Sequence, residues 1–168
     1  MNHIMLLAWA RRLRLGLQRG RLDLTWITPD WAVGAAPPPG LLPAVVQAGI
    51  SSLLDLRAEA SPDPRACGCH GLRRLHLPVP DGQAPSQDQF AQGTAWVLSE
   101  VAAGRRVLIY CHAGSGRSVI LACAVLLVMG YPLSQTLPLV ARRRTVAQPT
   151  EAQVAALQRF ATSRGHQR

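Results

Sequence analysis

The sequence predicts an α/β protein whose central, mostly parallel sheet of about five strands is covered by helices on both faces. Short apolar stretches that end in Gly, Pro or charge alternate along the chain with helical patterns. Strands of nearly continuous apolar residues must be buried on both sides, so helices are expected on each face of their sheet. With 168 residues, 48% of them hydrophobic, the chain has the size of one domain with its own core.

Five stretches are predicted as strands because each is short, apolar and bounded by turn-forming or charged residues. They are Leu24–Ile27, Trp31–Gly34, Ser52–Leu56, Arg74–Leu77 and Val107–Tyr110. Between the third and the fourth of them, Glu59–Gly71 is the most loop-like stretch of the chain.

Two helix starts are predicted from capping boxes, in which a Ser or Thr and a Gln three residues later bond each other's backbone. The two pairs are Ser86 with Gln89 and Thr150 with Gln153. A further helix is expected to begin near Thr136, so that Pro138 falls in its first turn, where proline is tolerated. This helix is expected to end at the basic cluster Arg142–Arg144.

The formal charge of the chain is +9, and all 18 basic residues are arginines. A basic balance favours anionic partners such as phosphoesters, nucleic acid or acidic lipid surfaces, but it does not specify a fold. Four cysteines at this spacing do not form a disulfide framework, so a reducing compartment is expected. The longest apolar run, Val119–Met129, is too short to span a membrane, which predicts a soluble, cytoplasmic protein.

Residues 1–22 form a basic segment before the predicted single domain at residues 23–168. The apolar part of the segment, Ile4–Ala10, precedes its arginine cluster, whereas a secretory signal has the opposite order. Three interpretations stay open: an ordinary solvated helix, an amphipathic helix on an anionic membrane surface, or an organelle transit segment. A membrane-surface or organelle localisation is therefore the alternative to the cytoplasmic one.

The most informative stretch is the strand Val107–Tyr110, which leads through Cys111 into a loop with two glycines and then into an apolar helix. Free N–H groups and the dipole at a helix N-terminus favour an anion, so this loop predicts a phosphate cradle. Gly114 and Gly116 are expected to supply its unusual backbone angles. The same field lowers the pKa of a thiol at the start of the loop, which makes Cys111 a candidate nucleophile.

The residues after Cys111 are candidates for holding the phosphate. Arg117 can bind two phosphate oxygens with its planar guanidinium, a geometry that Lys does not reproduce. Ser118 is placed to donate a hydrogen bond to the cysteine sulfur as it leaves. Cys123, on the apolar helix, is instead predicted to belong to the core. The predicted phosphate-binding residues are His112, Ala113, Gly114, Ser115, Gly116 and Arg117.

The motif Cys111-x5-Arg117-Ser118 resembles the signature of protein tyrosine and dual-specificity phosphatases. Leu77–Gly82 resembles the general-acid loop of that family. Two further stretches resemble its opening strands, Ile27–Gly34 and Leu53–Arg57. One position departs from the pattern, because the family usually has His before the cysteine and this chain has Tyr110. A less depressed thiolate pKa is expected as a result.

Asp81 is predicted as the general acid. A phosphomonoester needs its leaving oxygen protonated, and Asp81 lies in a Pro-Asp-Gly turn after a predicted strand, in the position that the resemblance implies. The predicted reaction is attack by Cys111 to form a thiophosphoryl enzyme, followed by hydrolysis with water that Asp81 activates. The rival carboxylate, Asp88, follows the capping residue Ser86, where the helix dipole already explains a negative charge.

Neither a metal nor a cofactor is predicted. The cluster that contains Cys67 and Cys69 has no second ligand pair at a usual zinc spacing. Either of these cysteines is a hypothetical resolving partner for an oxidised Cys111. Arg57 and Glu59 are expected to form an ion pair near the site.

Members of the family that this chain resembles act on phosphotyrosine, phosphothreonine, phosphoinositides or phosphatidylglycerophosphate. The residues of the loop favour a phosphorylated protein or a small phosphoester as substrate, and no nucleic acid partner is expected. Phospholipid and phosphoinositide phosphatases of the superfamily often carry basic residues in the loop, whereas His112 and Ser115 are not fixed cations. A phosphate-binding pseudophosphatase is a second alternative, although both nucleophile and acid are present. A rhodanese-type sulfurtransferase also places a cysteine before a helix, but Arg117-Ser118 and Asp81 argue against it.

Overall fold

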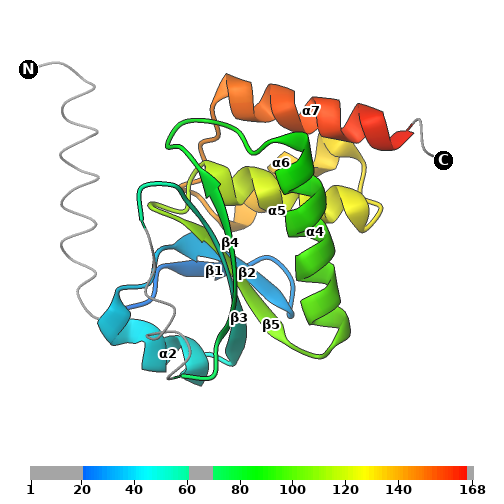
Figure 1. Cartoon of the computed structure of the whole chain (residues 1–168). Helices are drawn as coiled ribbons and strands as arrows, with labels where there is room; N and C mark the ends of the chain where they lie inside the picture. The colour runs from blue at the N-terminus through cyan, green and yellow to red at the C-terminus, as the bar shows by residue number, and fades with distance from the viewer. Residues whose placement is uncertain (1–20, 61–69, 166–168) are drawn as a thin grey trace, which may run out of the picture.

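The computed structural model describes residues 21–60 and 70–165, which form one five-stranded sheet with helices packed on it (Figure 1). Its strands are β1 (Leu24–Trp26), β2 (Trp31–Ala35), β3 (Ile50–Arg57), β4 (Arg73–Val79) and β5 (Arg106–Cys111). Their order across the sheet is β1-β2-β5-β3-β4, with β1 antiparallel to β2 and all other pairs parallel. The predicted α/β class and all five predicted strands are confirmed, with small shifts at the strand ends.

Helices cover both faces of the sheet, but unequally. The elements outside the sheet are η1 (Pro39–Leu41), α2 (Leu42–Gln47), α4 (Gln87–Ala102), α5 (Arg117–Val128), α6 (Leu133–Arg143) and α7 (Glu151–Gly165). The short helix α2 packs on one face, while α4 and α5 pack on the other and are joined there by α6 and α7 (Figure 1). The larger part of the core therefore lies on the α5 side.

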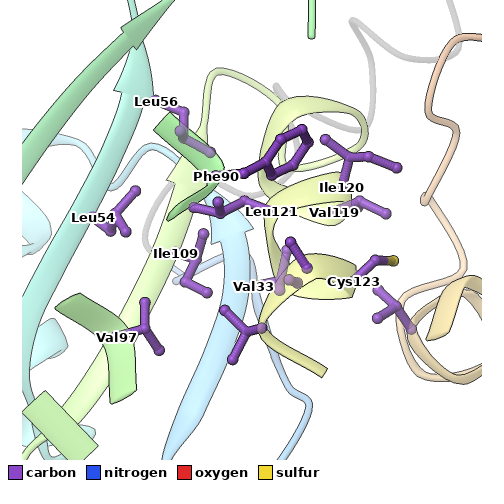
Figure 2. Packing of buried hydrophobic residues seen from close by; sticks show 14 of the residues in the cluster. Val33, Leu54, Leu56, Phe90, Val97, Ile109, Val119, Ile120, Leu121 and Cys123 are labelled. Atoms are coloured by element: carbon purple, nitrogen blue, oxygen red, sulfur yellow. The ribbon is translucent and has the colours of Figure 1, made fainter. Parts of the chain in front are cut away.

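Helix α5 is apolar on all sides, and such a helix must be buried on all sides. Figure 2 shows side chains of α5 in one cluster with side chains from the strands and from α4. The labelled residues are Val33, Leu54, Leu56, Phe90, Val97, Ile109, Val119, Ile120, Leu121 and Cys123. Cys123 is fully buried in this cluster, as predicted, and burial raises the pKa of its thiol to about 12. The tight packing fixes the N-terminal end of α5 against the sheet.

Both predicted capping boxes are present. The Ser86 hydroxyl accepts from the Gln89 N–H, and the Gln89 side chain accepts from the Ser86 N–H, so α4 begins at Gln87. Thr150 and Gln153 make the same reciprocal pair at the start of α7. Each box satisfies backbone donors that a helix N-terminus otherwise leaves without intrahelical partners.

The predicted start of α6 is wrong. This helix begins at Leu133, so Pro138 lies inside it and not in its first turn. Proline in a helix interior costs about 3 kcal/mol, because it lacks an N–H and its ring crowds the preceding turn. Leu133, Leu137 and Val140 pack onto the core from this helix, and burial of these three side chains offsets that cost.

The carboxyl ends of the three central parallel strands meet where β5 delivers Cys111. Cys111 lies beside Ala35 of β2, and the preceding Tyr110 lies beside Asp55 of β3. Ligands of α/β sheets bind at this edge, so the fold places the candidate nucleophile where a binding site is expected.

Some sequence predictions fall outside the described part of the chain. These are the basic segment, of which residues 1–20 are not described, and the cysteines Cys67 and Cys69. Within residues 21–60 and 70–165, no helix combines the length and the apolar character that crossing a membrane requires.

Phe160→Ala is expected to destabilise the fold by about 3–5 kcal/mol, because it removes a buried aromatic side chain. The Phe160 ring stacks on Phe90 of α4 at a centroid distance of 5.2 Å and fastens α7 to the core. Chemical denaturation measures the loss. The control Gln158→Ala, on the exposed side of the same helix, should stay within about 0.5 kcal/mol of wild type. Equal stability of the two variants would contradict the packing role of Phe160.

Candidate active site

A cavity of about 500 Å³ opens at the carboxyl edge of the sheet. Three segments line it: the loop after β5, the turn after β4 and the residues before and at the start of α7. Its lining residues are Asp81, Gly82, Cys111, His112, Ala113, Ser115, Gly116, Arg117, Gln148, Pro149, Thr150 and Gln153. The structure thus brings the predicted nucleophile, clamp and acid to one cavity, although the acid lies 30 residues before the nucleophile in the chain.

The loop after Cys111 has its carbonyl groups bonded to atoms outside it. Five consecutive carbonyls accept hydrogen bonds in this way: His112 from Ala36 N–H, Ala113 and Gly114 from Arg144, Ser115 from Gln148 N–H, and Gly116 from Ile120 N–H. In a planar trans peptide the C=O and N–H point in opposite directions. The loop therefore turns the N–H groups of residues 113–117 toward the hollow that it surrounds, which suits an anion.

The two loop glycines do different things. Gly114 has φ +65°, in the left-handed region, as the sequence predicts. Gly116 does not share that conformation, because its φ is −121°. A Cβ on Gly116 would lie 3.0 Å from Gln153 Oε1, a tight contact that the Gln153 side chain would have to relieve by a small shift. Of the predicted site residues, Gly114 and Ser118 are not among those that line the cavity.

Cys111 is almost fully buried, with its sulfur 3.3 Å from Ser118 Oγ. Ser118 is the second residue of α5 and is buried too. The N-cap residue of this helix is Gly116, which makes no side-chain capping bond, and the first turn of the helix follows the loop directly. This arrangement fits the predicted hydrogen bond from the Ser118 hydroxyl to the sulfur.

The Arg117 guanidinium is held at one side of the cavity by three groups. Its Nη1 and Nη2 both bond Glu59, each at 2.7 Å, and Nη1 also donates to the Val79 carbonyl at 2.8 Å. Asp81 Oδ1 lies 3.0 Å from Nη2. The hydrogen bond from Arg117 lowers the pKa of the Glu59 carboxyl to about 2. The same pair raises the pKa of Arg117 above its ordinary value.

The expected ion pair between Arg57 and Glu59 is wrong. Arg57 bonds Asp55 instead, through Nε at 3.0 Å and Nη2 at 2.9 Å, on the α2 side of the sheet. Tyr110 donates its hydroxyl hydrogen to the same carboxylate at 3.0 Å. Alternate residues of a strand point to opposite faces, so Tyr110 points away from the cavity that its neighbour Cys111 enters.

Asp81 lies on the turn that follows β4, with its side chain 85% exposed. Gly82 next to it has φ +76°, which explains the glycine of the Pro-Asp-Gly turn. The segment at the start of α7 holds this turn, because Thr150 Oγ1 donates to the Gly82 carbonyl and Gln153 Nε2 to the Gln83 carbonyl. The acid turn is thus tied to both Arg117 and α7.

Sequence reasoning missed the contribution of the stretch before α7. Gln148, Thr150 and Gln153 line the cavity, but in the sequence only a capping box was visible there. Gln153 is 1% exposed, and a buried amide of this kind needs partners for all its polar atoms. The available signal was Gln153 itself, a polar residue on the side of α7 that packs inward. The sequence did not show which loop it would meet.

Within the described ranges, no three His, Cys, Asp or Glu side chains lie close enough together to hold a metal ion. Asp88 lies in the first turn of α4, as predicted, and does not line the cavity. Asp81 is therefore the one carboxylate among the described lining residues of the cavity. Glu59 does not line the cavity and accepts hydrogen bonds from Arg117.

The model of a protein family described as "Polymorphic toxin system, DSP-PTPase phosphatase" matches residues 37–131. That range includes Asp81 and the whole loop from Cys111 to Ser118. A comparison with curated proteins found no match.

Solved structures share the fold. Tk-PTP in its active form is 28% identical to this chain, with a TM-score of 0.79 over 83% of this chain and 97% of that one. A mouse putative dual specificity phosphatase complexed with zinc tungstate is 26% identical, with a TM-score of 0.78 over 89% and 93%. PTPMT1 in complex with PI(5)P is 18% identical, with a TM-score of 0.78 over 86% of this chain and 97% of that one. This likeness is one of fold only.

Glu59→Gln is expected to weaken binding of inorganic phosphate about tenfold or more, because Arg117 loses the charge-assisted bonds that fix its plane. Isothermal titration measures this. The depressed pKa of Glu59 also sets a pH window: the stabilisation is fully present above its ordinary value of 4.5 and is lost as the pH falls through about 2.

The difference in unfolding midpoint between wild type and Glu59→Gln should therefore shrink from pH 4.5 downward. Asp30→Asn, an exposed carboxylate that does not line the cavity, serves as the control and should leave phosphate affinity unchanged. Unaltered phosphate affinity in Glu59→Gln would show that Arg117 does not depend on this carboxylate.

Proposed function

This chain belongs to the DSP-PTPase phosphatase family of polymorphic toxin systems, and from that premise we propose that it hydrolyses phosphomonoesters through a thiophosphoryl-enzyme intermediate. One observation carries the proposal. Cys111 lies at the floor of a cavity whose loop turns N–H groups inward, with the Arg117 guanidinium and the Asp81 carboxylate at the same cavity. A nucleophile, an anion cradle and an acid are the groups that this reaction requires.

In the first step the Cys111 thiolate attacks phosphorus, and an S–P bond forms as the bond to the ester oxygen breaks. The electron pair goes to that oxygen, which takes a proton from Asp81. The exposed position of Asp81 on a short turn supports this role, because a leaving group enters from the open side of the cavity. The loop N–H groups and Arg117 stabilise the charge on the remaining phosphoryl oxygens.

In the second step the Asp81 carboxylate takes a proton from water, which attacks phosphorus. An O–P bond forms, the S–P bond breaks, and phosphate leaves with Cys111 again a thiolate. Ser118 Oγ, 3.3 Å from the sulfur, donates a hydrogen bond that stabilises this thiolate as it departs. The four predicted catalytic residues, Cys111, Arg117, Asp81 and Ser118, thus each have a separate task.

Arg117 is proposed to exchange partners when the substrate binds. Glu59 bonds both terminal nitrogens and keeps the guanidinium in plane, whereas Asp81 touches Nη2 alone from an exposed position. An exposed single contact is worth little, so a phosphoryl oxygen displaces it readily. Displacement releases Asp81 toward the leaving group at the moment when the acid is needed.

The proposed substrate is a phosphorylated protein or a small phosphoester. Among the lining residues of the described chain, Arg117 is the one fixed cation. Besides Asp81 and Cys111, the polar side chains of the wall are those of His112, Ser115, Gln148, Thr150 and Gln153. A polyanionic headgroup is better served by several cations. The tungstate in the mouse relative supports an oxyanion site, since tungstate and phosphate are both tetrahedral oxyanions.

A phosphoinositide or phospholipid is the second candidate substrate, because the structural neighbour PTPMT1 is complexed with PI(5)P. A panel decides between the two classes. Phosphotyrosyl and phosphothreonyl peptides, an aryl phosphate, phosphatidylinositol phosphates and phosphatidylglycerophosphate are compared by kcat/KM. Hydrolysis of none of them, with phosphate binding retained, would identify a phosphate-binding pseudophosphatase and contradict the proposed function.

Cys111→Ser is expected to abolish hydrolysis of an aryl phosphate while the fold and phosphate binding are largely retained, because a hydroxyl does not ionise near neutral pH. Cys123→Ala is the matched control, since Cys123 is a core thiol that does not line the cavity, and it should retain activity per folded molecule. Stopped-flow release of the aryl alcohol measures both. Hydrolysis by Cys111→Ser near the wild-type rate would eliminate the cysteine mechanism.

Asp81→Asn is expected to lower kcat by roughly 10²- to 10⁴-fold, the scale of a lost general acid. The loss should be smaller for aryl phosphates with good leaving groups, which need little protonation. Asp88→Asn is the control: it should cost about 0.3–1 kcal/mol of stability through the helix dipole and leave kcat unchanged. Were Asp88→Asn the variant that loses activity, the assignment of the acid turn would be wrong.

A further inference from the structure

Arg144, the residue directly after α6, has a buried guanidinium that lies behind the phosphate loop and outside the cavity. It is 2% exposed, and each of the five N–H donors of the guanidinium meets an acceptor. On one side Nη1 and Nη2 bond the Asp23 carboxylate at 3.0 and 3.2 Å, and Nη1 reaches Thr25 Oγ1 at 3.3 Å. On the other side it bonds two loop carbonyls, Ala113 and Gly114.

We propose that Arg144, oriented by Asp23, is a positioning residue that sets the direction of two peptide groups in the phosphate loop. This inference rests on the proposed function of that loop. The Ala113 and Gly114 carbonyls belong to the same peptide planes as the N–H groups of Gly114 and Ser115. Holding these carbonyls outward keeps the two N–H groups turned toward the bound anion, and it keeps two negative carbonyl ends away from it.

The loop backbone is built to admit this guanidinium. A Cβ on Gly114 would lie 2.4 Å from Arg144 Nη2 and equally close to the Gly34 carbonyl of β2. Gly114 is therefore required for contact with Arg144 as well as for its positive φ. Arg144, β2 and the loop pack as one unit at this point.

Asp23 directs the guanidinium rather than merely neutralising it. Its two carboxylate oxygens bond two different nitrogens, which fixes the plane of the guanidinium and so the direction in which Nε and Nη2 meet the loop. The Asp23 carbonyl also accepts from the Ala35 N–H of β2, which anchors Asp23 to the same strand. The residue before β1 and the residue after α6 thus act together on the loop from behind.

Arg144→Lys tests the inference, because it keeps the charge but replaces a planar guanidinium that donates five hydrogen bonds with an ammonium that has three donors on one atom. The matched control is Arg142→Lys, an exposed arginine in the last turn of the same helix. Binding of inorganic phosphate, kcat and KM for an aryl phosphate, the pH profile of kcat/KM and the unfolding midpoint are measured for both variants.

Arg144→Lys is expected to lose about tenfold to a hundredfold in phosphate affinity and in kcat/KM, with the acid limb of the pH profile moved to higher pH. Misaligned N–H groups stabilise both the bound anion and the thiolate less well, and a merely structural role would move neither. Arg142→Lys should match wild type. If Arg144→Lys lowers the unfolding midpoint but keeps the phosphate affinity and the pH profile, the proposal is overturned.

Asp23→Asn tests the inference if Arg144→Lys does not fold. It keeps the shape of the side chain but removes the negative charge that pairs with the Arg144 guanidinium. It should shift phosphate affinity in the same direction by a smaller factor, and affinity equal to wild type overturns the proposal. Measurements on the wild type distinguish a failure of the proposed function from a failure of this inference. If the wild type binds phosphate but hydrolyses no substrate, the proposed function fails, and the phosphate affinities of the variants still test the role of Arg144.

Discussion

The outward anchoring of the phosphate-loop carbonyls is the constraint on which the site depends. Five consecutive carbonyls, from His112 to Gly116, are bonded by groups from different parts of the chain: the end of β2, α5, the end of α6 and the stretch before α7. Buried carbonyls must find donors, and here the donors lie behind the loop. Because each peptide plane is rigid, satisfying the carbonyls also aims the N–H groups. Anion binding is thus a consequence of how the surrounding elements pack.

Hydrogen bonds to neighbouring groups also orient the guanidinium of Arg117 at the cavity. Its Glu59 contacts involve both terminal nitrogens at 2.7 Å, whereas Asp81 makes one contact from an almost fully exposed position. Charge-assisted paired bonds hold firmly, while exposed single ion pairs contribute from nothing to about 1 kcal/mol. The two carboxylates on one guanidinium therefore differ in permanence: Glu59 orients Arg117, and Asp81 is free to leave it for a substrate.

Local signals in the sequence predicted much of this molecule. The strands, the two capping boxes and the loop from Cys111 to Ser118 depend on neighbours within a few residues, and the structure has each of them in place. The start of α6 was misplaced because tertiary burial overrode the preference of Pro138 for a first turn. The pairing of Arg57 with Glu59 was wrong because proximity in sequence was taken for proximity in space. Strand alternation sends Arg57 to the α2 face, where Asp55 lies.

Gln153 explains why the remaining part of the site was invisible. The pattern from Thr150 to Gln153 is fully accounted for by a helix cap, so nothing in the sequence asked for a second role. In the fold its Nε2 donates to the Gln83 carbonyl of the acid turn, and its Oε1 lies where a Cβ on Gly116 would nearly touch it. One amide side chain therefore caps α7 and spans the acid turn and the phosphate loop. When a local role such as helix capping accounts for a residue, the sequence gives no sign of a second contact with a distant segment. Sequence reasoning is therefore limited at a site that distant segments form together.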